Sequence, residues 1–185
     1  TNHKAHPHEN CAREVMQLFT IGLYELNNDG TPKTDLLGNK TETYTQSDIS
    51  NLARVFTGYD WDWSKSTWVS GYESYDIPTT EFASARMVLD SNNHSMLEVK
   101  FLGVTIPANT PGKDALKTAL DTLYNHPNAG PFFARQMIQR LITSNPSPGY
   151  VSRCADNGNN KVSGVRGDLK AVWRAILLDD EARTL

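Results

Sequence analysis

Two carboxylates, an amide and a guanidinium stand close together near the start of the sequence. Glu9, Asn10, Arg13 and Glu14 lie within six consecutive positions, and residues four apart on a helix share a face. A carboxylate pair can act as general acid and general base, with the guanidinium holding the substrate. The same set also suits a helix start, where acidic side chains and a Glu–Arg pair are stabilising. A buried polar network that fixes how this helix meets its neighbours is a third interpretation.

An aromatic stretch between residues 59 and 75 has the composition of a sugar-binding surface. It contains three of the four tryptophans, with Asp and Ser residues among the rings, and its aromatic members are Tyr59, Trp61, Trp63, Trp68, Tyr72 and Tyr75. Ring faces offer contact area to the apolar faces of sugars, and polar neighbours orient the hydroxyls. The rings could instead anchor a long loop onto the helices, but the gathering of three tryptophans favours ligand contact. We therefore expect substrate contacts from Tyr59, Trp61, Trp63, Trp68 and the amide of Asn10.

A histidine with charged neighbours is a further candidate for proton transfer. His94 stands shortly before Glu98 and Lys100 in the sequence, and an imidazole beside a carboxylate can act as a general base or a proton carrier. Asn92 and Asn93 come directly before it, so a turn at the surface is the alternative interpretation.

Three histidines at the amino end could bind a metal. His3, His6 and His8 are spaced by three and two residues, and imidazoles can converge on a divalent cation. The spacing matches none of the standard zinc patterns, so exposed histidines on a flexible end are the alternative. The sequence requires no cofactor, and a divalent metal is the one that these residues would fit.

The composition argues against several classes of function. The chain has 185 residues, a formal net charge of -3 and a pI of about 5.9, with no cluster of Lys and Arg, so no nucleic-acid partner is expected. No apolar stretch approaches the roughly 18 residues of a membrane span. Phosphate-binding glycine loops and the HExxH and GxSxG motifs are absent, which leaves nucleotide hydrolysis, zinc-peptidase and α/β-hydrolase chemistry without support. Cys11 and Cys154 either form a disulfide in an oxidising compartment or lie apart as small apolar residues.

Apolar residues at helical spacing predict the elements that position these side chains. Helices are expected over 9–26, 45–58, 113–125 and 131–143, with a short helical turn over 150–155 and a last helix that starts at 167–168. The first of these helices is expected to fade over residues 22–27. Turn residues at 28–30 predict either a small hairpin or an ordered loop over 23–36, and one or two strands are expected within 99–106. The prediction is a mostly-α, irregular helical domain of four to five helices, with a long aromatic-rich loop and a small β-hairpin. Residues 1–185 are expected to form a single domain.

Three stretches of the sequence carry a family resemblance. The first is ENCARE at 9–14 with QLFTIG at 17–22, and the second is YTQSD at 44–48 with ARVFTG at 53–58. The third joins HPN at 126–128, SNPSP at 144–148, RGDLKAV at 166–172 and LLDDEAR at 177–183. In this order, and over nearly the whole chain, they resemble the C-terminal part of the bacterial domain-of-unknown-function family 1800.

The resemblance implies a setting but no reaction. Members of this family are usually much longer and many carry export signals, so we expect the C-terminal part of a longer protein with a periplasmic or extracellular location. The family's polar motifs map onto residues 9–14 and onto His94. The sequence departs from the family pattern at His8, where Asn is usual, at Cys11, where an aromatic is usual, and at Lys100, which is displaced from its place after the histidine.

The leading hypothesis is a carbohydrate-active domain of an exported bacterial protein, with glycoside hydrolysis as its reaction. Glu9 and Glu14 would be the acid–base pair, Arg13 and His94 would assist, and the aromatic stretch would contact a polysaccharide. The remainder of its own chain is the other expected partner.

Two alternatives remain at this point. One is a non-enzymatic scaffold or assembly module of the cell envelope, in which residues 9–14 form a buried network and the aromatic stretch is a partner surface. The other is a metal-dependent enzyme built on His3, His6 and His8. The sequence therefore leaves open whether the protein is an enzyme.

Overall fold

The chain divides into two compact units. The computed structural model describes residues 7–70, 76–159 and 164–184. The first unit combines residues 1–12 with 47–119, and the second combines residues 13–46 with 120–185. Helices α1 (Glu9–Glu14) and α3 (Gly112–Asn125) each begin in the first unit and end in the second. The single-domain prediction stays a prediction.

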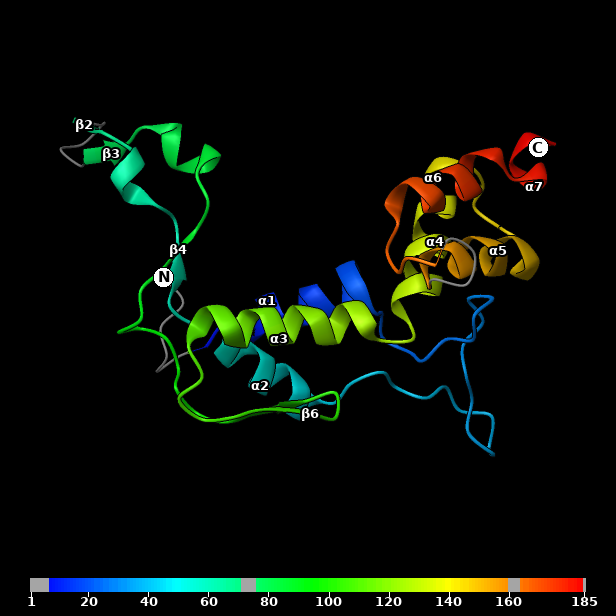
Figure 1. The fold of residues 1–185 in the computed structure, drawn as a ribbon, viewed down its shortest axis with the longest axis horizontal. Coiled ribbons are helices and arrows are strands. Elements are labelled where there is room, and N and C mark those ends of the chain that lie inside the picture. Colours follow the sequence, from blue (N-terminus) through cyan, green and yellow to red (C-terminus); the bar gives the residue numbers. More distant parts are fainter. Residues whose placement is uncertain (1–6, 71–75, 160–163, 185) are drawn as a thin grey trace. The chain divides into compact units, whose positions relative to one another are not determined.

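Helix α2 (Gln46–Val55), labelled in Figure 1, contributes apolar side chains to the core of the first unit. Its buried side chains, which include Ile49, Leu52 and Ala53, recur at helical spacing. Further buried side chains come from a β-hairpin and from α3, and these are Val99, Phe101, Ile106, Ala115 and Ala119.

A tight β-hairpin follows the turn at residues 90–94. Strands β5 (Val99–Phe101) and β6 (Val104–Ile106) pair antiparallel, with Phe101 opposite Val104. Leu102 and Gly103, which form the two-residue turn between them, have φ angles of 48° and 77°, and this left-handed conformation gives a hairpin turn the twist of its strands. The backbone N–H of Leu102 donates to Asp48 Oδ1 of α2 at 2.8 Å, which holds the turn in place.

Residues 59–89, which we call the aromatic segment, are joined to the rest of the first unit at one strand pair. Strands β1 (Tyr59–Asp60) and β4 (Val88–Leu89) pair antiparallel at its base. The described residues between them form the 3-10 helices η2 (Trp63–Lys65) and η4 (Thr80–Ser84) and a hairpin of β2 (Trp68–Ser70) and β3 (Asp76–Pro78). The expected aromatic-rich loop therefore has short regular elements of its own.

The second unit is a helical bundle preceded by an irregular loop. Its helices are α4 (Ala129–Leu141), α5 (Pro148–Gly158), α6 (Leu169–Leu178) and α7 (Asp180–Arg183), and a π-helix, η1 (Val15–Thr20), continues directly from α1. Ile138, Tyr150, Cys154 and Ile176 are each fully buried in the core that α4, α5 and α6 share. The Tyr150 hydroxyl donates to the carbonyl of Ile176 in that core, and burial raises the pKa of this phenol to about 12.

The loop over residues 23–42 is held by paired backbone rather than by strands. Isolated bridges join Tyr24 to Glu42, Leu26 to Pro32 and Thr34 to Lys40, so the chain doubles back twice. The turn at Asn28-Asp29-Gly30 lies where the sequence placed it, with the Asp29 carboxylate accepting from the Thr31 N–H at 2.9 Å.

The mostly-α prediction with a small β-hairpin is confirmed. The first helix ends at Thr20, just before the fade that was expected from Gly22 onwards, but its change to π-helix at Val15 was not expected. Gly22 explains the end, because its φ is 75° and a Cβ there would lie 2.7 Å from the Phe132 ring. Helix α5 is longer than the short turn predicted over 150–155, and α7 has no counterpart among the predicted elements.

Candidate functional site

Two tryptophans of the aromatic segment pack against one phenylalanine, and a third tryptophan packs against one of the two. The ring centroid of Phe82 lies 4.8 Å from that of Trp63 and 5.4 Å from that of Trp61, and Trp63 lies 6.0 Å from Trp68. These spacings are typical of favourable aromatic pairs. We call Trp61, Trp63, Trp68 and Phe82 the aromatic cluster. The sequence predicted the three tryptophans as a group but missed Phe82, which the chain brings back from outside the stretch.

The tryptophans of the aromatic cluster keep much of their surface in solvent. Their exposed fractions are 43% for Trp61, 37% for Trp63 and 56% for Trp68. Three neighbouring indoles exposed to this extent form an apolar surface of the kind that marks a binding site. The rings pack on one another, so the surface is held together by its own members.

Hydrogen bonds within the segment fix the backbone under the aromatic cluster. Asp62 Oδ1 accepts from the backbone N–H of Ser64 at 3.2 Å and from its hydroxyl at 2.5 Å, which caps η2. Ser66 Oγ accepts from the Phe82 N–H at 3.1 Å, and Thr79 Oγ1 accepts from the Thr67 N–H at 3.0 Å. These hydrogen bonds thus hold the backbone near Trp63, which precedes the hairpin, and near Phe82, which follows it.

Tyr59 belongs to a different set of contacts. Its hydroxyl donates to the carbonyl of Gly112 at 3.2 Å, and burial raises the pKa of this phenol above its ordinary value. It lines an apolar pocket with His8, Cys11 and Met87. Two further tyrosines of the aromatic stretch, Tyr72 and Tyr75, lie outside the described residues.

Two polar residues of α1 are hydrogen-bonded to side chains near the start of α2. The Ser50 hydroxyl donates to Glu9 Oε1 at 2.5 Å within the first unit, and Arg13 Nη2 donates to Gln46 Oε1 at 3.1 Å within the second. Glu14 is partly exposed and Asn10 is exposed. Burial raises the pKa of the Tyr44 phenol, which the charge of Arg13 opposes and that of Glu14 reinforces.

His94 is a buried residue of the first unit rather than part of a surface turn. It is 3% exposed, and its Nδ1 lies 2.9 Å from the carbonyl oxygen of Thr57, so Nδ1 carries the proton and donates. The Thr57 hydroxyl in turn accepts from the Ser95 N–H at 2.8 Å. Glu98 and Lys100 form an exposed ion pair with each other, at 2.8 Å. The structure thus gives His94 a role in joining the end of α2 to the following turn.

The predicted metal ligands are only partly described. His3 and His6 lie outside the described residues, and His8 is exposed. Elsewhere in the described ranges, no group of three or more His, Cys, Asp or Glu side chains is placed to hold a metal ion. Cys11 is exposed and Cys154 is buried, and both thiols are free. Burial raises the pKa of Cys154 to about 12.

Comparison with known proteins gives a family and nothing further. The family profile described as "Protein of unknown function (DUF1800)" matches residues 1–184. The chain belongs to the DUF1800 family. Neither the curated proteins nor the solved structures contain a match to it.

The third stretch that carries the DUF1800 resemblance holds the second unit together. Arg166 donates from Nε and Nη2 to the carbonyl of Tyr124 at 3.0 and 2.8 Å, and from Nη2 to that of His126 at 3.1 Å. These carbonyls belong to the C-terminal end of α3, where helices leave acceptors without partners. A Cβ at Gly167 would lie 2.3 Å from the Tyr124 hydroxyl oxygen, so only glycine fits there. Asp168 then caps α6 by accepting from the Ala171 N–H at 3.1 Å.

Two distant parts of the same DUF1800 stretch form a clasp between α5 and α7. Ser147 caps α5, and its N–H and hydroxyl donate to the two carboxylate oxygens of Glu181 at 2.8 and 2.5 Å. Arg153 donates to both oxygens of Asp179 at 2.7 Å, and these hydrogen bonds hold the pKa of Asp179 below its ordinary value. The polar residues of this DUF1800 stretch therefore stabilise the fold. The aromatic cluster lies outside all three stretches.

Proposed function

We propose that this DUF1800 chain binds polysaccharide through the aromatic cluster, in the periplasmic or extracellular setting that its family resemblance implies. The observation that carries the proposal is the half-exposed state of three clustered indoles, at 37–56% of their surface. An indole face covers the apolar C–H face of a sugar ring at little entropic cost, because the ring is already held by its neighbours.

Polar groups stand beside these rings to orient sugar hydroxyls. Asp62 and Ser64 adjoin Trp63 in the sequence and are tied to each other at 2.5 Å, and a carboxylate retains acceptor capacity after two hydrogen bonds. Thr67 and Thr79 pair their hydroxyls at 3.3 Å beside Trp68. Apolar faces next to fixed polar atoms are the usual composition of a carbohydrate site.

Binding is better supported than hydrolysis. A glycosidase needs two carboxylates on either side of one bond, whereas Glu9 is engaged by Ser50 at 2.5 Å and Glu14 stands five residues later on the same helix, about 140° around its axis. Hydrolysis therefore remains a second proposal, resting on Glu14. Unchanged glycan turnover in Glu14→Gln would remove that residue from any mechanism.

The scaffold alternative rests on the polar contacts of α1. The Glu9–Ser50 and Arg13–Gln46 hydrogen bonds are what an assembly module would use to join its helices. It differs from the binding proposal in one respect, since a scaffold has no need of affinity for glycans.

Sedimentation with insoluble polysaccharides tests the proposal. Cellulose, chitin and an insoluble xylan are incubated with the protein and with two variants, Trp68→Ala and Trp173→Phe. Trp68 is 56% exposed, so its loss is expected to weaken binding about tenfold without unfolding the chain. Trp173 packs against Phe133 in the second unit, and Trp173→Phe is expected to bind as the parent does. The proposal is wrong if the parent sediments with none of the three, or if both variants bind equally well.

A further inference from the structure

An apolar pocket of about 250 Å³ opens in the second unit. Its wall draws on the π-helix, the end of α3, the start of α4 and the start of α6, through Phe19, Leu120, Phe133 and Leu169 among others. An engineered apolar cavity of about 150 Å³ takes up benzene. The space is therefore large enough for a short alkyl chain.

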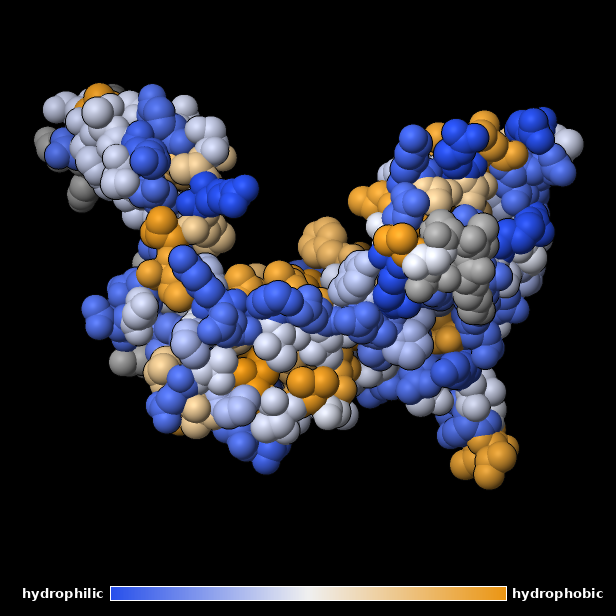
Figure 2. All heavy atoms as spheres, viewed as in Figure 1, coloured by the Kyte–Doolittle hydropathy of each residue, from blue (hydrophilic) through white to orange (hydrophobic). Residues whose placement is uncertain are grey.

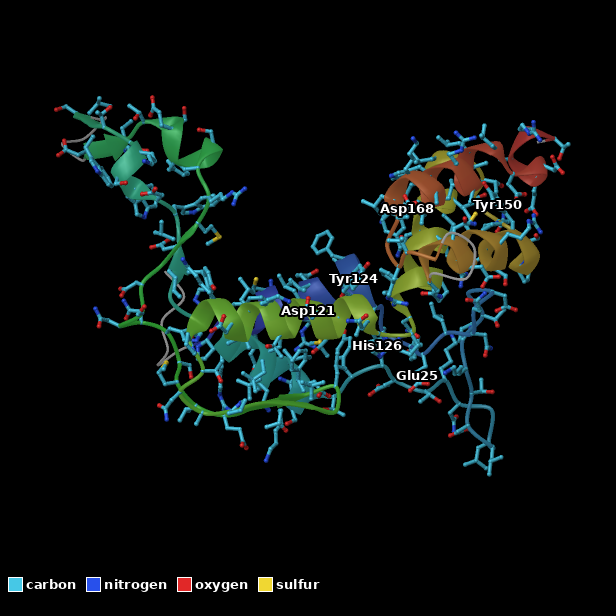
Figure 3. The ribbon with its side chains drawn as sticks, viewed as in Figure 1. Glu25, Asp121, Tyr124, His126, Tyr150 and Asp168 are labelled. Atoms are coloured by element: carbon cyan, nitrogen blue, oxygen red, sulfur yellow. The ribbon has the colours of Figure 1, made fainter. Side chains whose placement is uncertain are left out.

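The polar side chains of the wall direct their polar atoms to the backbone. The Thr20 hydroxyl donates to the carbonyl of Val15 at 2.7 Å, and the Tyr124 hydroxyl donates to the carbonyl of Arg166. Figure 3 places Tyr124 near the C-terminal end of α3 and Asp168 at the start of α6. With these atoms occupied, the pocket presents carbon to whatever enters it.

The π-helix contributes Phe19 and Thr20 to the wall of this pocket. Phe19 lines the pocket yet is 71% exposed, and the Thr20 hydroxyl bond to Val15 stabilises the wider turn from within. Single π-helical turns are rare and recur at functional sites. Leu169, at 57% exposure, and Leu120, at 47%, also stand at the rim. Figure 2 shows apolar surface near α6 in the same unit.

Among the described residues that line the pocket, one is charged, and it is cationic. Arg166 donates to the carbonyls of Tyr124 and His126 and to Asn159 Oδ1. These contacts account for four of the five guanidinium N–H groups, which leaves one on Nη1 for a ligand. An anionic head at Arg166 and an alkyl tail among the apolar side chains would satisfy both parts of the site.

We propose that this pocket binds a medium-chain carboxylate, with the carboxylate at Arg166 and the chain between Phe19, Phe133 and Leu169. The charge of Arg166 selects the acid over a neutral amphiphile. The volume of the pocket selects a chain of intermediate length. This binding is independent of the aromatic cluster.

Calorimetric titration of the whole chain with straight-chain carboxylates tests the proposal. From butyrate to decanoate, affinity is expected to rise about fourfold for each added CH₂ that is buried. Decanoate is expected to bind about tenfold more tightly than decanol, which lacks the charge. Absence of decanoate binding, or equal affinity for butyrate and decanoate, would overturn the site, and equal affinity for decanol would overturn the role of Arg166.

Two matched variants locate the binding. Leu169→Trp enlarges a side chain at the rim, and Leu177→Trp makes the same change on the same helix at a similar exposure, 50% against 57%, away from the pocket wall. Leu169→Trp is expected to weaken decanoate binding more than about tenfold and Leu177→Trp less than about twofold. Leu120→Trp, on α3, serves as a second obstruction should Leu169→Trp fold poorly. Equal effects of the rim and control variants would contradict the assignment.

Discussion

Asn128 is a single side chain that organises one loop of the second unit. It is 1% exposed, its Nδ2 donates to the carbonyls of Ile21 and Tyr24 at 2.8 Å each, and its Oδ1 accepts from the Leu26 N–H at 2.9 Å. The resemblance to the family included this residue, but nothing in its local sequence predicts contacts made more than 100 positions away. Buried polar residues of this kind become visible only when the fold brings their partners to them.

Replacing Asn128 tests this role. Asn128→Ala is expected to lower the free energy of unfolding by about 2–3 kcal/mol, because it leaves backbone groups of the loop without partners. Asn125→Ala, which removes one exposed bond to the carbonyl of Asp121 at 2.8 Å, is the control and is expected to cost less than about 1 kcal/mol. Urea denaturation measures both, and equal losses would contradict the argument.

The two thiols should differ sharply in reactivity. Cys154 is fully buried and its pKa is raised to about 12, so it is neither accessible nor ionised near neutrality, whereas Cys11 is exposed. An aromatic disulfide reagent is expected to label one thiol per native chain and both after denaturation. Rapid labelling of two thiols in the native protein would show that the core around Cys154 is open.

His126 should give the stability a dependence on pH. Burial lowers its pKa below the ordinary 6.5, and its Nδ1 accepts from the Asn128 N–H at 3.1 Å, which requires that nitrogen unprotonated. Below about pH 6.5 the unfolded chain takes up the proton more readily than the folded one, so stability falls as the pH drops. His126→Asn is expected to have a shallower loss of stability between pH 7 and pH 5 than the parent. Parallel curves would contradict this assignment.

At the scale of elements, periodicity was a good guide where helices are regular. The apolar spacing predicted α2, α3, α4 and α6 to within a few residues. It did not show the change to π-helix at η1, because a stretch of six residues is too short for its apolar spacing to distinguish i→i+5 from i→i+4 hydrogen bonding. Helix α5 was underestimated, although Ser147 followed by Pro148 is a helix-start signal.

The candidate site, like the helices, could be predicted from the sequence only in part. The three tryptophans at positions 61, 63 and 68 predicted the aromatic cluster, because their closeness in the sequence is visible without a structure. Phe82 and the burial of His94 were not predictable, because both depend on where the chain returns after the hairpin. Position in sequence likewise could not show that Tyr59 bonds to Gly112 rather than joining the other rings.

The β5–β6 turn offers a prediction at this scale. Leu102 has a φ of 48°, a conformation that costs a branched side chain about 1 kcal/mol and suits Asn. Leu102→Asn is therefore expected to raise the free energy of unfolding by about 0.5–1 kcal/mol. Thr105→Asn, on the exposed face of β6, is the control and is expected to lower it, because Asn is disfavoured in strands. A loss of stability in Leu102→Asn would mean that its packing outweighs the backbone strain.

At the scale of the whole molecule, the two proposed binding sites belong to different units. The first holds the aromatic cluster, and the second holds the Arg166 and Glu181 contacts together with the apolar pocket. In the described part of the chain, no helix combines the length and apolar character that crossing a membrane requires. Contacts of the third DUF1800 stretch, such as those of Arg166, Asp168 and Glu181, maintain the fold of the second unit, and the aromatic cluster lies between the family stretches.

Tryptophan fluorescence of the Trp173→Phe protein tests the central claim most directly. This variant keeps three tryptophans, all in the aromatic cluster, so its emission reports on that surface alone. Titration with a soluble β-glucan or xylan is predicted to shift and quench the emission with a saturable curve, and the added change Trp68→Ala is predicted to weaken that response about tenfold. Emission that stays constant across both polysaccharides would contradict the account.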